Sequence, residues 1–287
     1  TSINKVLLLK SLIISKIANM HYNVCHMIKI FYWNDIQTFL NTGKMDPFFE
    51  KGTGISIGCF DGLHLGHRML LKELVKQCKK ENLLAGVFSF KRPLPAIKHA
   101  DDYQGDITTL NQRIKLFEEL GIDFVVVVDF DESFSSILGA DFLNILLNAC
   151  NMELIAEGID FRCGFKGATD TQAIKYWAEQ NNVKYNFVDA VYHKAADGSE
   201  ERVSSSYIRQ MIQKGFFTTV NELLERPYEL DLEQIRSDMI AGKEKGTQVI
   251  PPDGIYQTMS EFDEPVRLEI KNGRILNISL CNSVRFE

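Results

Sequence analysis

ISIGCFDGLHLGHRMLLKEL, residues 55–74, passes from a strand pattern into a helix pattern within a few residues. Residues 55–60 form a short apolar run, and apolar residues recur at helical spacing in the second half of the segment. Between these two parts lie Gly58, Gly62 and Gly66, which let the backbone turn sharply and approach a ligand closely. The segment therefore predicts a buried strand, a tight turn and a helix, in that order.

The same alternation of short apolar runs and longer amphipathic stretches continues along the chain. Runs typical of strands lie at 27–33, 83–90, 123–130, 152–160 and 183–193. Apolar residues at helical spacing lie at 68–82, 108–121, 142–151, 171–182, 204–215 and 218–228. Strands that alternate with helices indicate βα units around a parallel sheet. We therefore predict an α/β fold with a Rossmann-like parallel sheet.

The last sixty or so residues have a different pattern. A charged helical stretch at 231–246 is followed by short alternating runs at 254–259, 266–270 and 275–280, with the hairpin-like turn KNG between the last two. We predict a main domain at 27–225 and a small C-terminal domain at 226–287 with one helix and several strands. Residues 1–26 are predicted to be an N-terminal tail, because lysines interrupt their apolar runs and no cleavage site follows.

Composition limits the partners of the protein. The 287 residues carry a formal net charge of −6, so no general basic field attracts nucleic acid or an anionic membrane. No stretch reaches the roughly 18 unbroken apolar residues of a membrane span. The six cysteines are scattered without a CxxC pair, which indicates reduced thiols and a cytoplasmic protein. We expect small-molecule partners, no nucleic acid and no membrane.

The glycine turn at 58–67 is a candidate phosphate site. It should lie at the carboxyl end of a strand and the N-terminus of a helix, where free amides and the helix dipole favour anions. His64 and His67 could both donate to one phosphate as negative charge builds up on its oxygens. Helix capping and metal binding are the alternatives for these histidines. Asp61 could orient a histidine or a metal, or it could cap the turn.

A second candidate is VSSSYIRQMIQKG, residues 203–215. Ser204, Ser205 and Ser206 directly precede an apolar-periodic helix, so one of them is suited to be its N-cap. The other serines could bind phosphate, and Arg209 shares their helical face and could hold the β and γ phosphates of a nucleotide. A plain capping cluster is the alternative.

Three segments resemble known signatures. GCFDGLHLGH resembles the HxGH motif of the nucleotidylyltransferase superfamily, and VSSSYIR resembles its (I/V)SS(S/T)xIR motif. EGIDFRCGFKGATD, residues 157–170, is similar to the GxDFRFGxxxxGD segment of bacterial FMN adenylyltransferases, the N-terminal module of bifunctional riboflavin kinase/FAD synthetases, with Cys163 in place of the second Phe. The resemblance spans roughly 27–228. It departs at SFKRPLP, which keeps Phe90 and Pro93 of a TFxPHP-like segment but lacks its histidine.

The resemblance implies an enzyme that transfers AMP from ATP to FMN, with Mg²⁺, giving FAD and pyrophosphate. It assigns catalytic roles to His64, His67, Ser205 and Arg209. It assigns ATP binding to Gly58, Phe60, Asp61, Gly66 and Ser206. It assigns flavin binding to Asp160, Phe161, Arg162 and Phe90, in which an aromatic ring can pack on the isoalloxazine.

The bifunctional relatives continue into a riboflavin kinase barrel with a GxxLGFPTAN-like motif. This sequence has ERPYEL at 225–230 and PPDGIY at 251–256, but not that motif. We therefore interpret 226–287 as a divergent remnant of the barrel without kinase activity. The alternatives are another acceptor, such as a pyridine or pantetheine nucleotide, and a non-catalytic nucleotide or flavin sensor. Gly62 disfavours the first, since those enzymes typically have Pro at this point of the motif.

Overall fold

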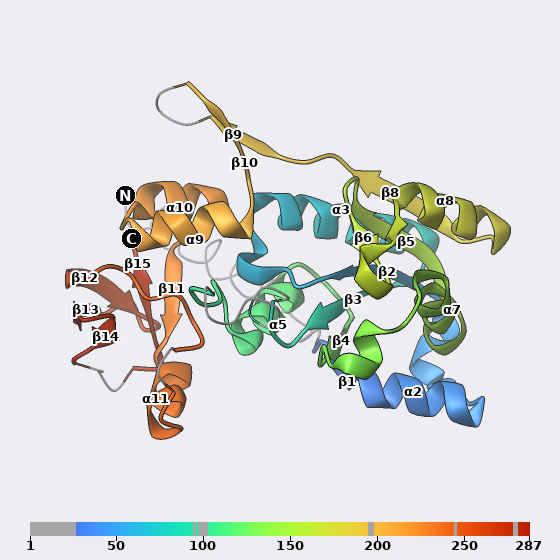
Figure 1. The fold of residues 1–287 in the computed structure, drawn as a ribbon, viewed down its shortest axis with the longest axis horizontal. Helices are drawn as coiled ribbons and strands as arrows, with labels where there is room; N and C mark the ends of the chain where they lie inside the picture. Colours follow the sequence, from blue (N-terminus) through green and yellow to red (C-terminus); the bar gives the residue numbers. More distant parts are fainter. Residues whose placement is uncertain (1–26, 94–95, 97–102, 195–197, 244–245, 278–280) are drawn as a thin grey trace, which may run out of the picture.

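The structure is a computed structural model that describes residues 27–287 except 94–95, 97–102, 195–197, 244–245 and 278–280. The predicted tail at 1–26 lies outside the described residues. In this part of the chain the structure has a six-stranded sheet and a five-stranded sheet at opposite ends of the molecule, with helices around both (Figure 1).

The larger sheet is entirely parallel, in the order β1-β4-β3-β2-β5-β8. Its strands are β1 (Lys29–Tyr32), β2 (Thr53–Gly58), β3 (Leu84–Phe90), β4 (Phe124–Val128), β5 (Met152–Gly158) and β8 (Lys184–Val188). The chain winds from β2 through β3 to β4 on one side and then returns to place β5 on the other side of β2. The predicted α/β fold with a Rossmann-like parallel sheet is confirmed.

Both faces of this sheet are covered by helices. The helices are α2 (Trp33–Thr42), α3 (Leu65–Glu81), α5 (Leu110–Glu119), α6 (Glu132–Ser135), α7 (Gly139–Cys150) and α8 (Thr171–Gln180). Alternate residues of β4 enter different cores: Val126 packs with α2, α7 and α8, whereas Val125 packs with α3 and α5. All five β4 residues are buried for this reason, as expected of a central parallel strand.

Side chains at the helix starts explain where several helices begin. Thr109 and Gln112 form a capping box at α5, and the Asp170 carboxylate accepts from the Ala173 amide at α8. At its other end α5 is followed by Gly121, whose φ of +83° ends the helix.

The smaller sheet is antiparallel, in the order β11-β15-β12-β13-β14. Its strands are β11 (Tyr228–Asp231), β12 (Gly254–Ser260), β13 (Pro265–Lys271), β14 (Arg274–Ile275) and β15 (Ser283–Phe286), and α11 spans Leu232–Ile240. The expected β-rich C-terminal part with one helix is therefore present. The prediction of a helix through residue 228 was wrong, because α10 (Phe217–Leu224) ends before β11 begins.

Helices α9 (Ser205–Gln213) and α10 share a hydrophobic core with the smaller sheet. Ile208 and Ile212 of α9 are buried with Leu268 and Phe286 of that sheet. The domain boundary at 225/226 stays a prediction, and it would divide this core.

The strand expected at 183–193 is divided. β8 ends at Val188, and β9 (Tyr192–Lys194) pairs with β10 (Glu200–Arg202) in an arm that stands away from the rest of the molecule (Figure 1). A second small hairpin, β6 (Arg162–Cys163) and β7 (Thr169–Asp170), follows β5. No helix within the described residues is long and apolar enough to cross a membrane.

Candidate functional site

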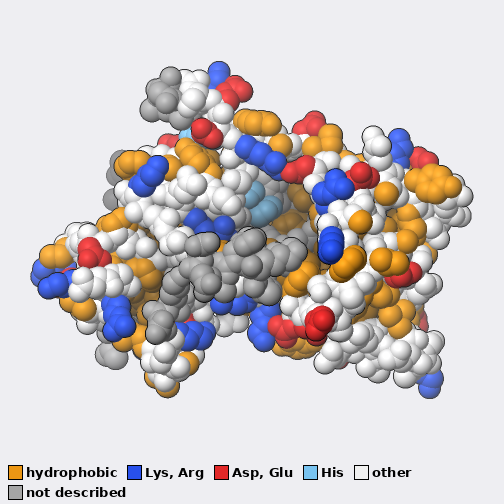
Figure 2. Space-filling model, in the orientation of Figure 1, with side chains coloured by type: hydrophobic (Ala, Val, Ile, Leu, Met, Phe, Trp, Pro, Cys, Tyr) orange, Lys and Arg blue, Asp and Glu red, His pale blue; other side chains and the backbone are white. Residues whose placement is uncertain are grey.

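A cavity of about 1040 Å³ opens where β2 and β5 end. This is the position at which the strand order reverses, and open α/β sheets bind ligands there. All thirteen site residues proposed from the sequence line this cavity. Histidine atoms are visible in the hollow near the centre of the face drawn in Figure 2. The structure thus brings the three sequence motifs together, whereas the role of each residue stays a prediction.

The lining contains an aromatic group beside the polar motifs. The Phe90 ring lies 5.7 Å from the Phe130 ring and 5.8 Å from the Phe134 ring, centroid to centroid, and the Phe134 ring lies 5.5 Å from that of Phe142. Phe161 packs against the same core and also lines the cavity. One cavity therefore offers both an apolar aromatic surface and a set of polar groups.

Backbone conformation explains the glycines of the turn between β2 and α3. Gly62 has φ +81°, and a Cβ there would lie 3.1 Å from Ile107. A Cβ at Gly58 would lie 3.1 Å from the Phe60 ring. Phe60 (φ 52°) and Leu63 (φ 37°) also have positive φ, which is unfavourable for residues with a side chain. The turn is therefore a strained segment, of the kind that gathers at functional sites.

The two histidines are stacked on one another, with ring centroids 3.6 Å apart and planes 18° from parallel. His64 is the N-cap of α3, and its Nδ1 accepts from the His67 amide at 3.4 Å. With Nδ1 as an acceptor, the proton of the neutral ring is on Nε2, which can donate. Capping and phosphate binding are therefore compatible roles for His64.

Burial keeps both imidazoles neutral. Desolvation lowers the pKa of His64 to about 4, against a smaller opposite effect of Asp61. Desolvation, aided by His64 and Arg113, lowers the pKa of His67 well below its usual value. Near neutral pH both rings can donate one hydrogen bond each without carrying a charge.

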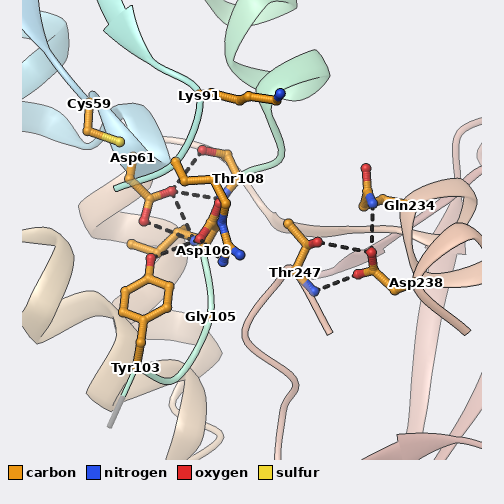
Figure 3. A network of polar contacts seen from close by, with 12 residues as sticks. Cys59, Asp61, Lys91, Tyr103, Gly105, Asp106, Thr108, Gln234, Asp238 and Thr247 are labelled. Carbon is orange, nitrogen blue, oxygen red and sulfur yellow. Dashed lines mark hydrogen bonds and ion pairs between the residues drawn. The ribbon is translucent and has the colours of Figure 1, made fainter. Parts of the chain in front are cut away.

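Asp61 is a buried acceptor for several groups. Its carboxylate accepts from the Ile107 amide at 3.0 Å, from the Thr108 amide at 3.0 Å and from the Thr108 hydroxyl at 3.1 Å, and it forms an ion pair with Arg209. In the described chain Asp61 forms no hydrogen bond with His64 or His67, although its charge raises the pKa of His64. Of the two predicted roles, fastening the turn is the one this geometry favours (Figure 3).

The second motif is partly engaged in the same network. Besides Asp61, the Arg209 guanidinium donates to the Gly105 carbonyl at 2.8 Å and to the Tyr103 hydroxyl at 3.1 Å.

The three serines of this motif have different contacts. The Ser204 hydroxyl accepts from the Tyr207 amide and caps α9, as one serine was predicted to do. The Ser205 hydroxyl donates to the Asp61 carbonyl at 2.9 Å. Ser206 lines the cavity and is exposed. Phosphates would have to compete with Asp61 for Arg209.

The third motif closes one side of the cavity. Asp160 forms an ion pair with Arg202, at the end of β10. Arg162 donates from Nε to the Gly167 carbonyl at 2.7 Å, which closes the β6–β7 hairpin. Cys163, which stands in place of the second Phe of the family segment, is buried in the apolar core. Sequence reasoning missed Arg202, although it lies next to the VSSS motif and lines the cavity.

Glu157, in β5, is a second cavity residue that sequence reasoning missed. It is 1% exposed, and its Oε1 accepts from the Ile57 amide at 2.6 Å. The β2–β5 ladder ends at the Ile55–Ile155 pair, so this side chain replaces the next ladder contact. Desolvation raises the pKa of Glu157 well above its usual value, with the Ile57 amide as a smaller opposing effect. A carboxyl directly after the apolar run Leu154–Ala156 is the signal that could have identified it.

Replacing Glu157 with glutamine should stabilise the protein increasingly as the pH rises. The wild-type carboxyl is deprotonated near pH 4.5 when unfolded but retains its proton to higher pH when folded. The wild type therefore loses stability as the pH rises from about 4.5 through the folded-state pKa, by about 1.4 kcal/mol per unit of difference between the two pKa values. Glutamine can still accept from the Ile57 amide and does not titrate.

Urea unfolding of Glu157→Gln and the wild type between pH 5 and pH 8 measures this effect. Glu153→Gln, at an exposed position of the same strand, is the control and should follow the wild type at every pH. A constant difference between Glu157→Gln and the wild type across this range would contradict a neutral buried carboxyl.

The described residues contain neither a cluster of metal-ligating side chains nor a disulfide. No three His, Cys, Asp or Glu side chains gather closely enough within them to hold a metal ion. No disulfide joins the five cysteines in this part of the chain.

The comparisons with known proteins agree with the motifs. The family model for FAD synthetase matches residues 47–207, more than half of the chain. The bifunctional riboflavin kinase/FMN adenylyltransferase of Buchnera aphidicola is 32% identical over 196 residues, which cover 68% of this chain and 61% of that protein. The protein of the same name from Escherichia coli K12 is 26% identical, with 72% of this chain and 67% of that protein covered.

Two further comparisons cover more of both chains. The FAD synthetase of Listeria monocytogenes is 24% identical over 239 residues, 82% of this chain and 91% of that protein. The crystal structure of a macrolide-efflux protein from Streptococcus pneumoniae superposes with a TM-score of 0.63 at 20% identity, covering 82% of this chain and 78% of that one, which shows a shared fold alone. From its match to the family model, together with the three motifs around one cavity, the chain belongs to the FAD synthetase family.

Proposed function

We propose that this protein is an FMN adenylyltransferase, which transfers AMP from ATP to FMN and releases pyrophosphate. The observation that carries the proposal is the single cavity in which a strained glycine turn and two neutral histidines face the same space as an aromatic group. The first set suits a phosphate chain, and the second suits a flat apolar ring such as isoalloxazine. The cavity thus offers a suitable surface both for the phosphates of ATP and for the flavin ring of FMN.

In the proposed reaction an oxygen of the FMN phosphate attacks the α-phosphorus of ATP in line. One O–P bond forms, the bond from the α-phosphorus to the bridging oxygen breaks, and pyrophosphate leaves with that electron pair. His64 and His67 donate to oxygens of the α-phosphate, together with the first amides of α3 near Gly66. The histidines stabilise charge and form no covalent intermediate.

The leaving pyrophosphate would be bound by the α9 end of the cavity. Ser206 is exposed there, and Ser205 and Arg209 are within the same turn of helix. Arg209 is held by Asp61, so the proposed role requires the phosphates to share or displace that ion pair. Asp160, Phe161, Arg162 and Phe90 would contact the flavin.

The proposal includes a Mg²⁺ ion that binds together with ATP. When bound, the ion would neutralise charge on the phosphates during transfer. Mg²⁺ is commonly held by one or two carboxylates together with substrate phosphates, so a three-residue protein cluster is not required. Asp160 is half exposed at the cavity and could make such a contact in exchange for its ion pair with Arg202, whereas Asp61 is buried and engaged by four donors.

We also propose that residues 226–287 lack riboflavin kinase activity and that the protein works in the cytoplasm. The absence of a GxxLGFPTAN-like motif from the printed sequence supports the first point. Scattered cysteines without a disulfide in the described residues support the second.

Chromatography of flavins after incubation with ATP and Mg²⁺ tests the proposal. FAD should form from FMN, and neither FMN nor FAD should form from riboflavin. Formation of FMN from riboflavin would contradict the absence of kinase activity. Transfer of AMP to nicotinamide mononucleotide or phosphopantetheine, but not to FMN, would identify another acceptor. No AMP transfer, with retained nucleotide or flavin binding, would favour a sensor.

A further inference from the structure

The carbonyl oxygens of the glycine turn are bound by side chains from other elements. Arg113 of α5 donates from Nη1 to the Cys59 carbonyl at 2.8 Å, and Arg226 donates from Nη2 to the Gly62 carbonyl at 2.7 Å. The Ser205 hydroxyl bonds the carbonyl of Asp61, between them. The carbonyl oxygens of the turn are thus held by Ser205, which lines the cavity, and by Arg113 and Arg226, which do not.

The two arginines also tie the turn to distant parts of the chain. Arg113 is fully buried, contacts the Cys59 Sγ at 2.8 Å and donates from Nη2 to the Lys91 carbonyl at 2.8 Å, so it joins the ends of β2 and β3. Arg226 donates from Nη1 to the Leu224 carbonyl at 3.1 Å, which joins the turn to the end of α10.

Neither arginine forms an ion pair with any residue that the structure describes. A buried guanidinium without a carboxylate is costly unless its environment supplies acceptors or a use for the charge. Backbone carbonyls supply the acceptors for both arginines, of which Arg113 is fully buried and Arg226 partly buried. Both positive charges therefore lie next to a turn that suits anions, without a directly paired carboxylate.

Each arginine acts on a different histidine. The groups that influence His67, after burial, are His64 and Arg113, and both lower the pKa of His67. For His64, burial is the largest cause, Asp61 raises the pKa, and Arg202 and Arg226 lower it. Arg113, on the Cys59 carbonyl, therefore acts on His67, and Arg226, on the Gly62 carbonyl, acts on His64.

We propose that Arg113 and Arg226 are positioning residues of the phosphate site, which fix the glycine turn by its carbonyls and place positive charge behind the two histidines. No carboxylate of the described chain forms an ion pair with either arginine, although Glu229, Glu119 and Asp61 offset part of the Arg226 charge from further away. The kinetic part of this inference rests on the proposed adenylyl transfer, whereas the histidine titrations do not.

The first test compares Arg113→Met and Arg226→Met by NMR titration of the histidine rings in the ligand-free full chain. Arg113→Met should move the titration of His67 to higher pH and leave His64 near its wild-type position. Arg226→Met should do the reverse. This crossed result distinguishes electrostatic positioning from general loosening of the fold, which would move both rings together. Arg236→Met, which removes an arginine that bonds the Cys281 carbonyl, is the control and should move neither.

The second test measures kcat for FAD formation and the affinity for ATP. The two methionine variants should each lose about 10- to 100-fold in kcat, as expected for losing hydrogen bonds from a charged group. Arg113→Lys and Arg226→Lys keep the charge but cannot span two carbonyls, so kcat should fall while the histidine titrations stay unchanged. If a methionine variant does not fold, the kcat of the lysine variant still tests whether the arginine positions the turn.

The inference is overturned if the methionine variants leave the titration pH of both histidines unchanged and kcat within two-fold of the wild type. It is also overturned if the lysine variants retain full kcat. If the wild type forms no FAD at all, the proposed function fails, and the crossed titration result still supports or overturns the placement of charge.

Discussion

Replacing His64 with alanine should lower kcat for FAD formation by about 10²- to 10³-fold, the usual cost of losing one donor to a charge that develops in the transition state. His67→Ala should cost a similar factor. Because the two rings are stacked and would serve one phosphate in the proposed reaction, the double variant should be far less impaired than the product of the two single effects. Steady-state rates at saturating ATP and FMN give these values.

The pH profile tests the protonation state in this mechanism. Since burial lowers the pKa of His64 to about 4, and that of His67 well below its usual value, kcat/KM should show no histidine step between pH 6 and pH 8. His193→Ala is the control variant, because His193 lies on the β9–β10 arm and does not line the cavity. A histidine step near pH 6.5 that disappears in His64→Ala would contradict neutral donors.

Replacing Asp61 with alanine should lower the free energy of unfolding by about 3–5 kcal/mol, because the change leaves the buried Arg209 guanidinium without its counter-charge. The amides of Ile107 and Thr108 would also lose their acceptor. Urea unfolding monitored by circular dichroism measures the difference. Asp263→Ala removes an exposed ion pair with Arg285 and should cost less than about 1 kcal/mol.

A double-mutant cycle separates the ion pair from the amide contacts. Arg209→Met should recover part of the stability that Asp61→Ala loses, because the double variant buries no unpaired guanidinium. The amide part of the loss should remain. If Asp61→Ala costs no more than Asp263→Ala, the network in Figure 3 does not hold the turn.

The parallel sheet could be predicted because its strands leave a strong pattern. Strands buried on both faces read as continuous apolar runs, as Val125 and Val126 of β4 illustrate by entering opposite cores. The end of α10 could not be predicted in the same way. Glu225, with φ 56°, ends that helix where a glycine would have given a signal, so the helix pattern seemed to run on to Tyr228.

The members of the site were predictable from motifs, whereas their contacts were not. Asp61 and Arg209 are 148 residues apart and meet only because α9 packs beside the glycine turn. Nothing local marks Arg113 as buried, since an arginine in an amphipathic helix is ordinarily a surface residue. Glu157 likewise gains its properties from the place where β2 and β5 separate. Such features depend on tertiary packing.

The hydrophobic core shared by α9, α10 and the smaller sheet has an evolutionary consequence. Ile208 and Ile212 anchor the helix that carries Ser205, Ser206 and Arg209, and their packing partners include Leu268 and Phe286. A substitution that loosens those strands would shift the serines and the arginine relative to the cavity. Selection for the proposed phosphate site would therefore extend to the C-terminal sheet, whose core residues act on the site without touching a ligand or performing chemistry.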